Sequence, residues 1–290
     1  MIDPSRIATG TIAGLLALLV WMLPGAAQQS SAPKNPAQPN SPQQRPAQQA
    51  TSDGELLTYF YKDPRPERLV GLVQRFQDTP AAAKWEAFPP VVGFFAAVCI
   101  AHPDKFSRLV PSDLKPKMSV AIATAVKLCG NERVAAALRQ TLERSPPDEQ
   151  MAAALAGLPS RLSDVRVSHP THLDIHWGAS FATGSPRHVA AITDFFAQAA
   201  NQSEAVAVDI AQIVIEMMGG PKGTLAQLRG KYGTDGAIRM AYAASALWAL
   251  QSNARQHAFV DQYVRKYMAD NPDTPATKAL TALMPRGSRT

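Results

Sequence analysis

Several residue types and motifs that mark common enzyme classes are scarce or missing in this chain of 290 residues. It has only two cysteines, and charged residues make up 18% of it. It contains no G-x-S-x-G nucleophile elbow, no H-E-x-x-H zinc motif and no glycine-rich loop ending in G-K-[ST]. The signatures of serine hydrolases, zinc proteases and P-loop proteins are therefore missing, and the sequence predicts neither catalytic residues nor a cofactor.

Support for nucleic-acid binding and for β-structure is also missing. The formal net charge is +6, yet the basic residues are scattered and no run of them is interleaved with aromatic residues. Nucleic acid is therefore not an expected partner. No apolar and polar alternation leads into an Asn-Gly or Asp-Gly hairpin turn. The expected fold class is all-α.

The first 27 residues have the order of features found in signal peptides. Arg6 precedes an apolar run over residues 7–23, which Pro24 and the small residues Gly25, Ala26 and Ala27 follow. This pattern predicts a cleaved signal peptide and a periplasmic or secreted protein. The alternative is an uncleaved anchor with the body facing the periplasm, since this run has the minimum length for a membrane span. Residues 7–23 are the only expected membrane contact, and no cysteine follows them for lipidation.

The amino-acid composition divides the rest of the chain into three segments. Residues 28–53 are almost wholly Gln, Pro, Ser, Asn and Ala. They predict a disordered linker, which serves either as a tether through the cell envelope or as a tail without a role. Residues 286–290 predict a short disordered tail. Residues 54–285 are expected to form a single all-helical domain.

Start and stop signals for helices recur along this domain. Gly130 is expected to end one helix and Asn131 to cap the next. Gly184, Ser185 and Pro186 repeat the arrangement, with proline in the first helical position. Helical hairpins are expected to begin near residues 171, 202 and 235, at a spacing typical of helical repeats. The sequence thus predicts an array of antiparallel helical hairpins, either a solenoid or an irregular multi-helix bundle.

Two helices are expected to have unusual burial. Residues 89–101, "PPVVGFFAAVCIA", are apolar but too short to cross a bilayer, so they predict a buried core helix. In residues 204–218, the only polar residues after Glu204 are Asp209, Gln212 and Glu216. Their spacing leaves one narrow polar stripe, so we expect this helix to be covered on most sides.

One stretch resembles a known kind of protein. Leu173-Asp174, Trp177 and Phe181-Ala182-Thr183-Gly184 resemble a helix-turn motif of exported bacterial all-helical proteins of the tetratricopeptide-like kind. The tetratricopeptide consensus itself is not met, because Ser180 and Phe181 stand where leucine and glycine are expected. The resemblance implies a helical-repeat fold and brings no activity with it. On a helix, Leu173, Trp177 and Phe181 share one face, which we expect to be turned to the core.

The two cysteines allow two interpretations. Cys99 and Cys129 lie about thirty residues apart in apolar stretches on neighbouring expected helices. In an oxidising compartment they can form one disulfide. Alternatively, both are buried free thiols, since cysteine is among the most buried residue types.

Residues 169–177, "HPTHLDIHW", hold the densest group of potential metal ligands. His172 and His176 lie one helical turn apart and could bind one ion, with His169 as a third ligand. Asp174 lies about 200° around the helix from each of these two and cannot join them. The alternative interpretation is that the histidines are structural residues at a helix start.

Together these patterns favour a non-enzymatic exported helical-repeat protein that binds a protein, a peptide or a cell-envelope component. A second hypothesis is a metal-binding protein or a metal-dependent hydrolase centred on His172 and His176. A third is a membrane-tethered spacer, which requires the apolar segment to remain uncleaved.

Overall fold

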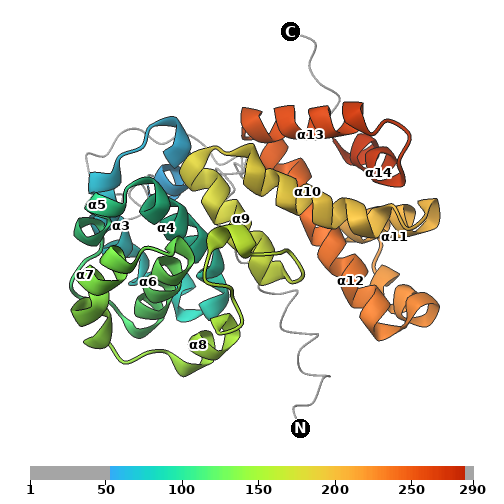
Figure 1. Cartoon of the computed structure of the whole chain (residues 1–290). Coiled ribbons are helices and arrows are strands. Elements are labelled where there is room, and N and C mark those ends of the chain that lie inside the picture. Colours follow the sequence, from blue (N-terminus) through green and yellow to red (C-terminus); the bar gives the residue numbers. More distant parts are fainter. Residues whose placement is uncertain (1–52, 285–290) are drawn as a thin grey trace, which may run out of the picture.

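The computed structural model in Figure 1 describes residues 53–284, and the chain is helical throughout this part, with no strand. The expected all-α class is therefore confirmed. The expected signal peptide, the tail at 286–290 and all but the last residue of the expected linker lie outside the described residues. That last residue, Asp53, lies in a helix that runs to residue 58, and it forms a salt bridge with Arg75.

The helices fall into two groups that are joined by α9 (Figure 1). The elements of the first group are η3 (Phe60–Lys62), η4 (Pro66–Arg68), α3 (Leu69–Phe76), η5 (Pro80–Ala83), η6 (Trp85–Ala87), α4 (Pro89–Ala101), α5 (Pro103–Phe106), η7 (Ser107–Leu109), α6 (Pro116–Cys129), α7 (Glu132–Glu143), α8 (Glu149–Leu155) and η8 (Leu162–Asp164). The second group comprises α9 (Pro170–Thr183), α10 (Pro186–Ala200), α11 (Glu204–Met217), α12 (Thr224–Ala254), α13 (Ala258–Asp270) and α14 (Pro275–Leu283).

Each group has its own hydrophobic core, and α9 contributes to both. The predicted stripe of Leu173, Trp177 and Phe181 packs into the second core, which confirms its inward orientation. Another face of the same helix, with Ile175 and Ala179, packs into the first core. A helix that is buried on two sides is apolar nearly all round. Helix α9 is thus the shared wall of the two cores.

The closest helix contact joins α4 to α9. A Cβ atom added at Gly93 of α4 would lie 1.8 Å from the carbonyl oxygen of Ile175. One added at Gly178 of α9 would lie 1.9 Å from the carbonyl oxygen of Pro90. The two backbones therefore touch, and only glycine fits at these two positions. As predicted, α4 is a core helix, with Phe94, Phe95 and most of its other side chains buried.

The predicted helix boundaries are confirmed at two turns. Gly130 ends α6 with φ 66°, and the Asn131 side chain accepts hydrogen bonds from the N–H groups at the start of α7. Gly184 ends α9 with φ 64°, and Ser185 caps α10. Positive φ values are nearly free of strain for glycine alone, which is why these residues mark the turns.

One boundary is met and one expected burial needs correction. A helix begins near residue 235, as expected, because α12 consists of two helices that meet at a kink at Gly233 (φ 70°, ψ 175°), and the second of them runs to Ala254, just before α13. Helix α11 is not covered on most sides, since Val208 and Ile215 are exposed, as is Met218 directly after the helix. Only its opposite face, with Ile210 and Val214, is buried in the second core.

Within residues 53–284, no single helix has both the length and the apolarity needed to cross a membrane. The segments Trp85–Ala101 and Pro103–Leu109 meet these criteria only when taken together, and they are bent by 119° at their junction.

The contact between α4 and α9 predicts a large effect from single methyl groups. Gly93→Ala and Gly178→Ala should each lower the free energy of unfolding by about 3 kcal/mol or more, because the added carbon forces the two backbones apart. Gly230→Ala is the matched control: this glycine also lies within a helix, but apart from its chain neighbours and the backbone of its own helix no atom lies within 4 Å of its added Cβ. Alanine there should raise stability by up to about 1 kcal/mol. Urea unfolding of the three variants measures these values, and equal effects at all three positions would contradict the close contact.

Candidate functional site

A groove of about 950 Å³ lies between α6, α7 and α8. In Figure 1, α7 and α8 lie beside α6, and residues 145–147 of the connection from α7 to α8 also line the groove. Ligand sites in proteins commonly have volumes of roughly 300–1,000 Å³, so this groove is large enough to hold a ligand. It is the candidate functional site.

The groove combines an apolar floor with a charged rim. Val120, Ala123 and Leu142 line it, as do Ala152 and Leu155 of α8. Its charged lining residues are Lys127, Glu132, Arg139, Glu143 and Arg161. Apart from Lys127, none of these five forms a salt bridge or a side-chain hydrogen bond within residues 53–284. Charges of both signs are thus available to a ligand.

Two contacts hold α8 against α6 and fix the width of the groove. Lys127 Nζ donates hydrogen bonds to the carbonyl oxygens of Ala156 and Leu158, at 3.4 and 2.6 Å, just after the end of α8. At the other end of α8, Lys117 lies 3.1 Å from Asp148, whose carboxylate caps the helix. The N–H group of Met151 and the nearby Lys117 lower the pKa of Asp148.

A disulfide anchors the floor of the groove to the core. Of the two interpretations that the sequence leaves open, the structure contains the bond between Cys99 and Cys129, with their Cα atoms 5.9 Å apart. It joins α4 to the last residue of α6, next to the turn at Gly130. The end of α6 is therefore covalently tied to the most buried helix of the first core.

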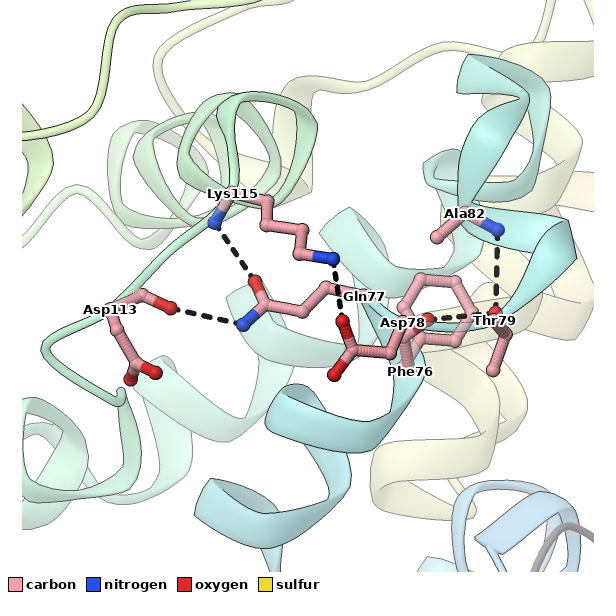
Figure 2. A network of polar contacts seen from close by, with 7 residues as sticks. All are labelled: Phe76, Gln77, Asp78, Thr79, Ala82, Asp113 and Lys115. Atoms are coloured by element: carbon pink, nitrogen blue, oxygen red, sulfur yellow. Dashed lines mark hydrogen bonds and ion pairs between the residues drawn. The ribbon is translucent and has the colours of Figure 1, made fainter. Parts of the chain in front are cut away.

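A polar network fixes the start of α6 (Figure 2). The Gln77 amide donates a hydrogen bond to the carbonyl oxygen of Asp113 at 3.0 Å and accepts one from the N–H group of Lys115 at 2.9 Å. Lys115 Nζ also lies 2.5 Å from Asp78. Beside them, the Thr79 hydroxyl donates to the Phe76 carbonyl and accepts from the N–H group of Ala82. The buried Gln77 side chain thus satisfies two backbone groups, the Asp113 carbonyl and the Lys115 N–H group, in the segment that leads into α6.

The structure does not bring His169, His172 and His176 together. His169 caps α9, with its Nδ1 accepting the N–H group of Thr171. The Nδ1 atom of His172 accepts the N–H group of Ser168. His176 instead contacts His188 of α10. Within residues 53–284, no three His, Cys, Asp or Glu side chains are placed as the ligands of a metal ion would be.

The buried pair of His176 and His188 was not predicted. Their Nδ1 atoms lie 3.2 Å apart, and Nε2 of His176 lies 2.9 Å from the carbonyl oxygen of Val165. A carbonyl oxygen only accepts, so we assign the proton of His176 to Nε2, which leaves its Nδ1 to accept from Nδ1–H of His188. Burial lowers the pKa of His176, and burial together with His176 and Arg187 lowers that of His188 to about 4. The pair is therefore neutral near pH 7 and links α9, α10 and the segment before α9. Two histidines twelve residues apart across a helix turn form no recognisable sequence motif.

Asp174 also lies on α9 and faces neither histidine of this pair. Its side chain is half-buried and forms no salt bridge with the described residues. Burial raises the pKa of its carboxyl to about 8. A carboxyl that holds its proton near neutral pH is a poor ligand for a cation.

A third buried histidine connects the two groups of helices. His257 precedes α13, and its Nδ1 lies 3.2 Å from the Tyr61 hydroxyl of η3. The rings of Tyr59, Phe181 and Phe259 pack around it, with centroids 4.9 to 5.8 Å away. Burial, together with the charge of Lys62, lowers the pKa of His257 to about 4. This histidine serves as a packing residue at the junction of the two cores.

The Gln77 network predicts unequal effects at two neighbouring positions. Gln77→Met should destabilise the protein by about 2 kcal/mol, because it leaves the Asp113 carbonyl and the Lys115 N–H group without partners. Asp78→Asn removes only an exposed ion pair, with side chains 57% and 68% exposed, and should cost less than about 1 kcal/mol. Thermal or urea unfolding compares the two variants, and a larger loss from Asp78→Asn would contradict this account.

The buried histidines contribute a loss of stability in mild acid, opposite in sign to the contribution of Asp174, whose pKa burial raises. In the unfolded chain a histidine takes up a proton near pH 6.5, whereas His188 and His257 do so only near pH 4. Their contribution is therefore constant above about pH 6.5 and becomes unfavourable as the pH falls toward 4, by at most about 3 kcal/mol for each residue. His188→Asn retains a donor to His176 and removes the titration, so it should flatten this part of the curve. Urea unfolding between pH 7.5 and 4.5 measures the slope, and an unchanged slope in the variant would be the contrary result.

Comparison with known proteins found no relative of this chain. No family model, no curated protein and no solved structure matches the chain. The function is therefore inferred from the geometry of the groove.

Proposed function

We propose that this chain is an exported, non-enzymatic binding protein that holds an extended peptide segment of a partner protein in the groove between α6, α7 and α8. The groove itself, with its volume of about 950 Å³ and its apolar floor, is the observation that carries the proposal. Burying apolar side chains of a ligand on such a floor supplies the main favourable free energy of binding.

The charges at the rim favour a peptide over an ion or a polyanion. Arg139 and Arg161 face the same groove as Glu132 and Glu143. A peptide carries both signs of charge and also has backbone donors and acceptors, so it can satisfy such a rim. A polyanion would be repelled by the two glutamates while it was attracted by the two arginines.

The fixed walls support the same proposal. The disulfide at Cys129, the Gln77 network and the hydrogen bonds of Lys127 hold α6 and α8 in place without a ligand. A preformed site loses little conformational entropy on binding. We infer that the groove binds as a rigid template, as the concave face of a tetratricopeptide-like array of helical hairpins would do.

Export is a separate part of the proposal. It rests on the apolar run at residues 7–23 and is supported by the disulfide, since such bonds persist in oxidising compartments. A chain that begins near residue 28 indicates a free periplasmic or secreted protein. An intact chain indicates a membrane-anchored one, and the mass of the protein recovered from cells distinguishes the two.

Panning the full-length protein against a displayed library of random twelve-residue peptides tests the binding proposal. The enriched peptides are then measured by fluorescence anisotropy against three variants. Ala123→Trp fills the groove floor and should weaken binding by about tenfold or more, as should the double variant Arg139→Ala, Arg161→Ala.

Arg133→Ala is the matched control, because Arg133 is an exposed arginine of the same helix α7 that does not line the groove. It should bind as the wild type does. The proposal fails if no peptide is enriched, or if the enriched peptides bind the Ala123→Trp variant as tightly as the wild type.

A further inference from the structure

Two of the four large apolar side chains that residues 53–284 expose lie on α11, and a third, Met218, directly follows its last residue. Val208 is 58% exposed, Ile215 39% and Met218 53%, whereas the fourth, Ile100, lies on α4. Single exposed apolar residues are common on protein surfaces. A group of them on one helix marks an interaction surface.

These side chains form one continuous stripe. With about 100° per residue, Val208, Ala211 and Ile215 fall within a sector of roughly 60° on the helix surface, and Met218 directly follows the end of the helix. Ala205, which is exposed, lies one turn closer to the start of the helix and about 60° to the side of Val208, on the side of the exposed Gln212. We call these five residues the α11 stripe. Its spacing of three and four residues is that of a seam between two packed helices.

The charges on α11 are already compensated within the molecule. Its charged residues are Glu204, Asp209 and Glu216. Their partners are Lys278 for Glu204, Lys231 and Tyr232 for Asp209, and the N–H groups of Gly223 and Thr224 for Glu216. Each of the three acids therefore has an internal partner, including Glu204, which lies within the sector of the stripe at the start of the helix. Two identical copies of this face can approach without like-charge repulsion, which otherwise opposes self-association.

The order of side-chain sizes along the stripe is complementary to itself. When two copies of α11 pack antiparallel, with the two-fold axis beside Ala211 and Gln212, Val208 of one copy faces Ile215 of the other. The small Ala205 then faces the long Met218 at both ends. An interface between identical subunits related by a two-fold axis requires this kind of reciprocal pairing.

We propose that the α11 stripe is a self-association surface on which a second copy of this chain packs antiparallel, α11 against α11. The surface is separate from the groove, which belongs to the first group of helices. One helix of 14 residues is about 21 Å long and presents less area than the roughly 800 Å² per partner of a standard interface. The dimer is therefore weak and depends on protein concentration.

Sedimentation equilibrium of the full chain, from about 5 µM to about 500 µM, tests for this dimer. The wild type should change from monomer to dimer across this range. Val208→Lys and Ile215→Lys should each weaken the association by about tenfold or more. Ile100→Lys is the matched control, because it places the same charge on another exposed apolar residue, and it should associate as the wild type does. All variants carry the same N-terminal segment, so any association through that segment cancels in the comparison.

Cross-linking of single-cysteine substitutions on α11 tests the antiparallel register. A mixture of Val208→Cys and Ile215→Cys chains, treated with a short bismaleimide, should give the mixed dimer. Val208→Cys alone should give little, whereas a parallel arrangement would link it to itself. Circular dichroism of each variant confirms that it is folded.

Three results would overturn the proposal: a wild type that stays monomeric at all concentrations, which would assign the stripe to a different partner; equal association of Val208→Lys and Ile100→Lys; or self-linking of Val208→Cys that exceeds the mixed product.

Discussion

The backbone contact between α4 and α9 is the constraint on which the rest of the structure depends. Gly93 and Gly178 allow two helices to meet with no side chain between them, so the flanking residues of both helices pack at close range. Because α9 also forms a wall of the second core, this contact joins the two cores. Dispersion energy is greatest where atoms are most closely packed, so close approach here stabilises both halves.

Near the contact between α4 and α9, polar side chains hold neighbouring helices in position. The pair of His176 and His188 joins α9 to α10, and His257 joins the second group to η3 through Tyr61. Both connections use neutral imidazoles, which are less costly to bury than charged groups. The groove lies away from these connections, on helices that a disulfide and the Gln77 side chain hold in place. The candidate binding surface is thus separate from the elements that join the two cores.

Much of the local structure could be predicted from the sequence, because local chemistry determines it. The turns at Gly130 and Gly184, the caps that follow them and the burial of residues 89–101 each depend on residues close together in the chain. The groove and the contact between His176 and His188 could not be predicted, since they depend on how distant segments pack. The exposure of Val208, Ile215 and Met218 was missed for a related reason: an apolar composition does not show whether another helix covers a face.

Helix α9 packs into both cores, and this affects the order in which the parts of the chain fold. Cys99 and Cys129 both precede α9, whose first residue, Pro170, follows the second cysteine by 41 positions. When the N-terminal part of the chain is the first to become available, the sulfur atoms of α4 and α6 can meet before α9, which completes the first core, is present. The disulfide, formed early, lowers the conformational entropy of the segment that α9 packs against, so less entropy is lost when α9 docks against Gly93. The second core then forms on a helix that is already in place, so that assembly proceeds along the chain from one end to the other.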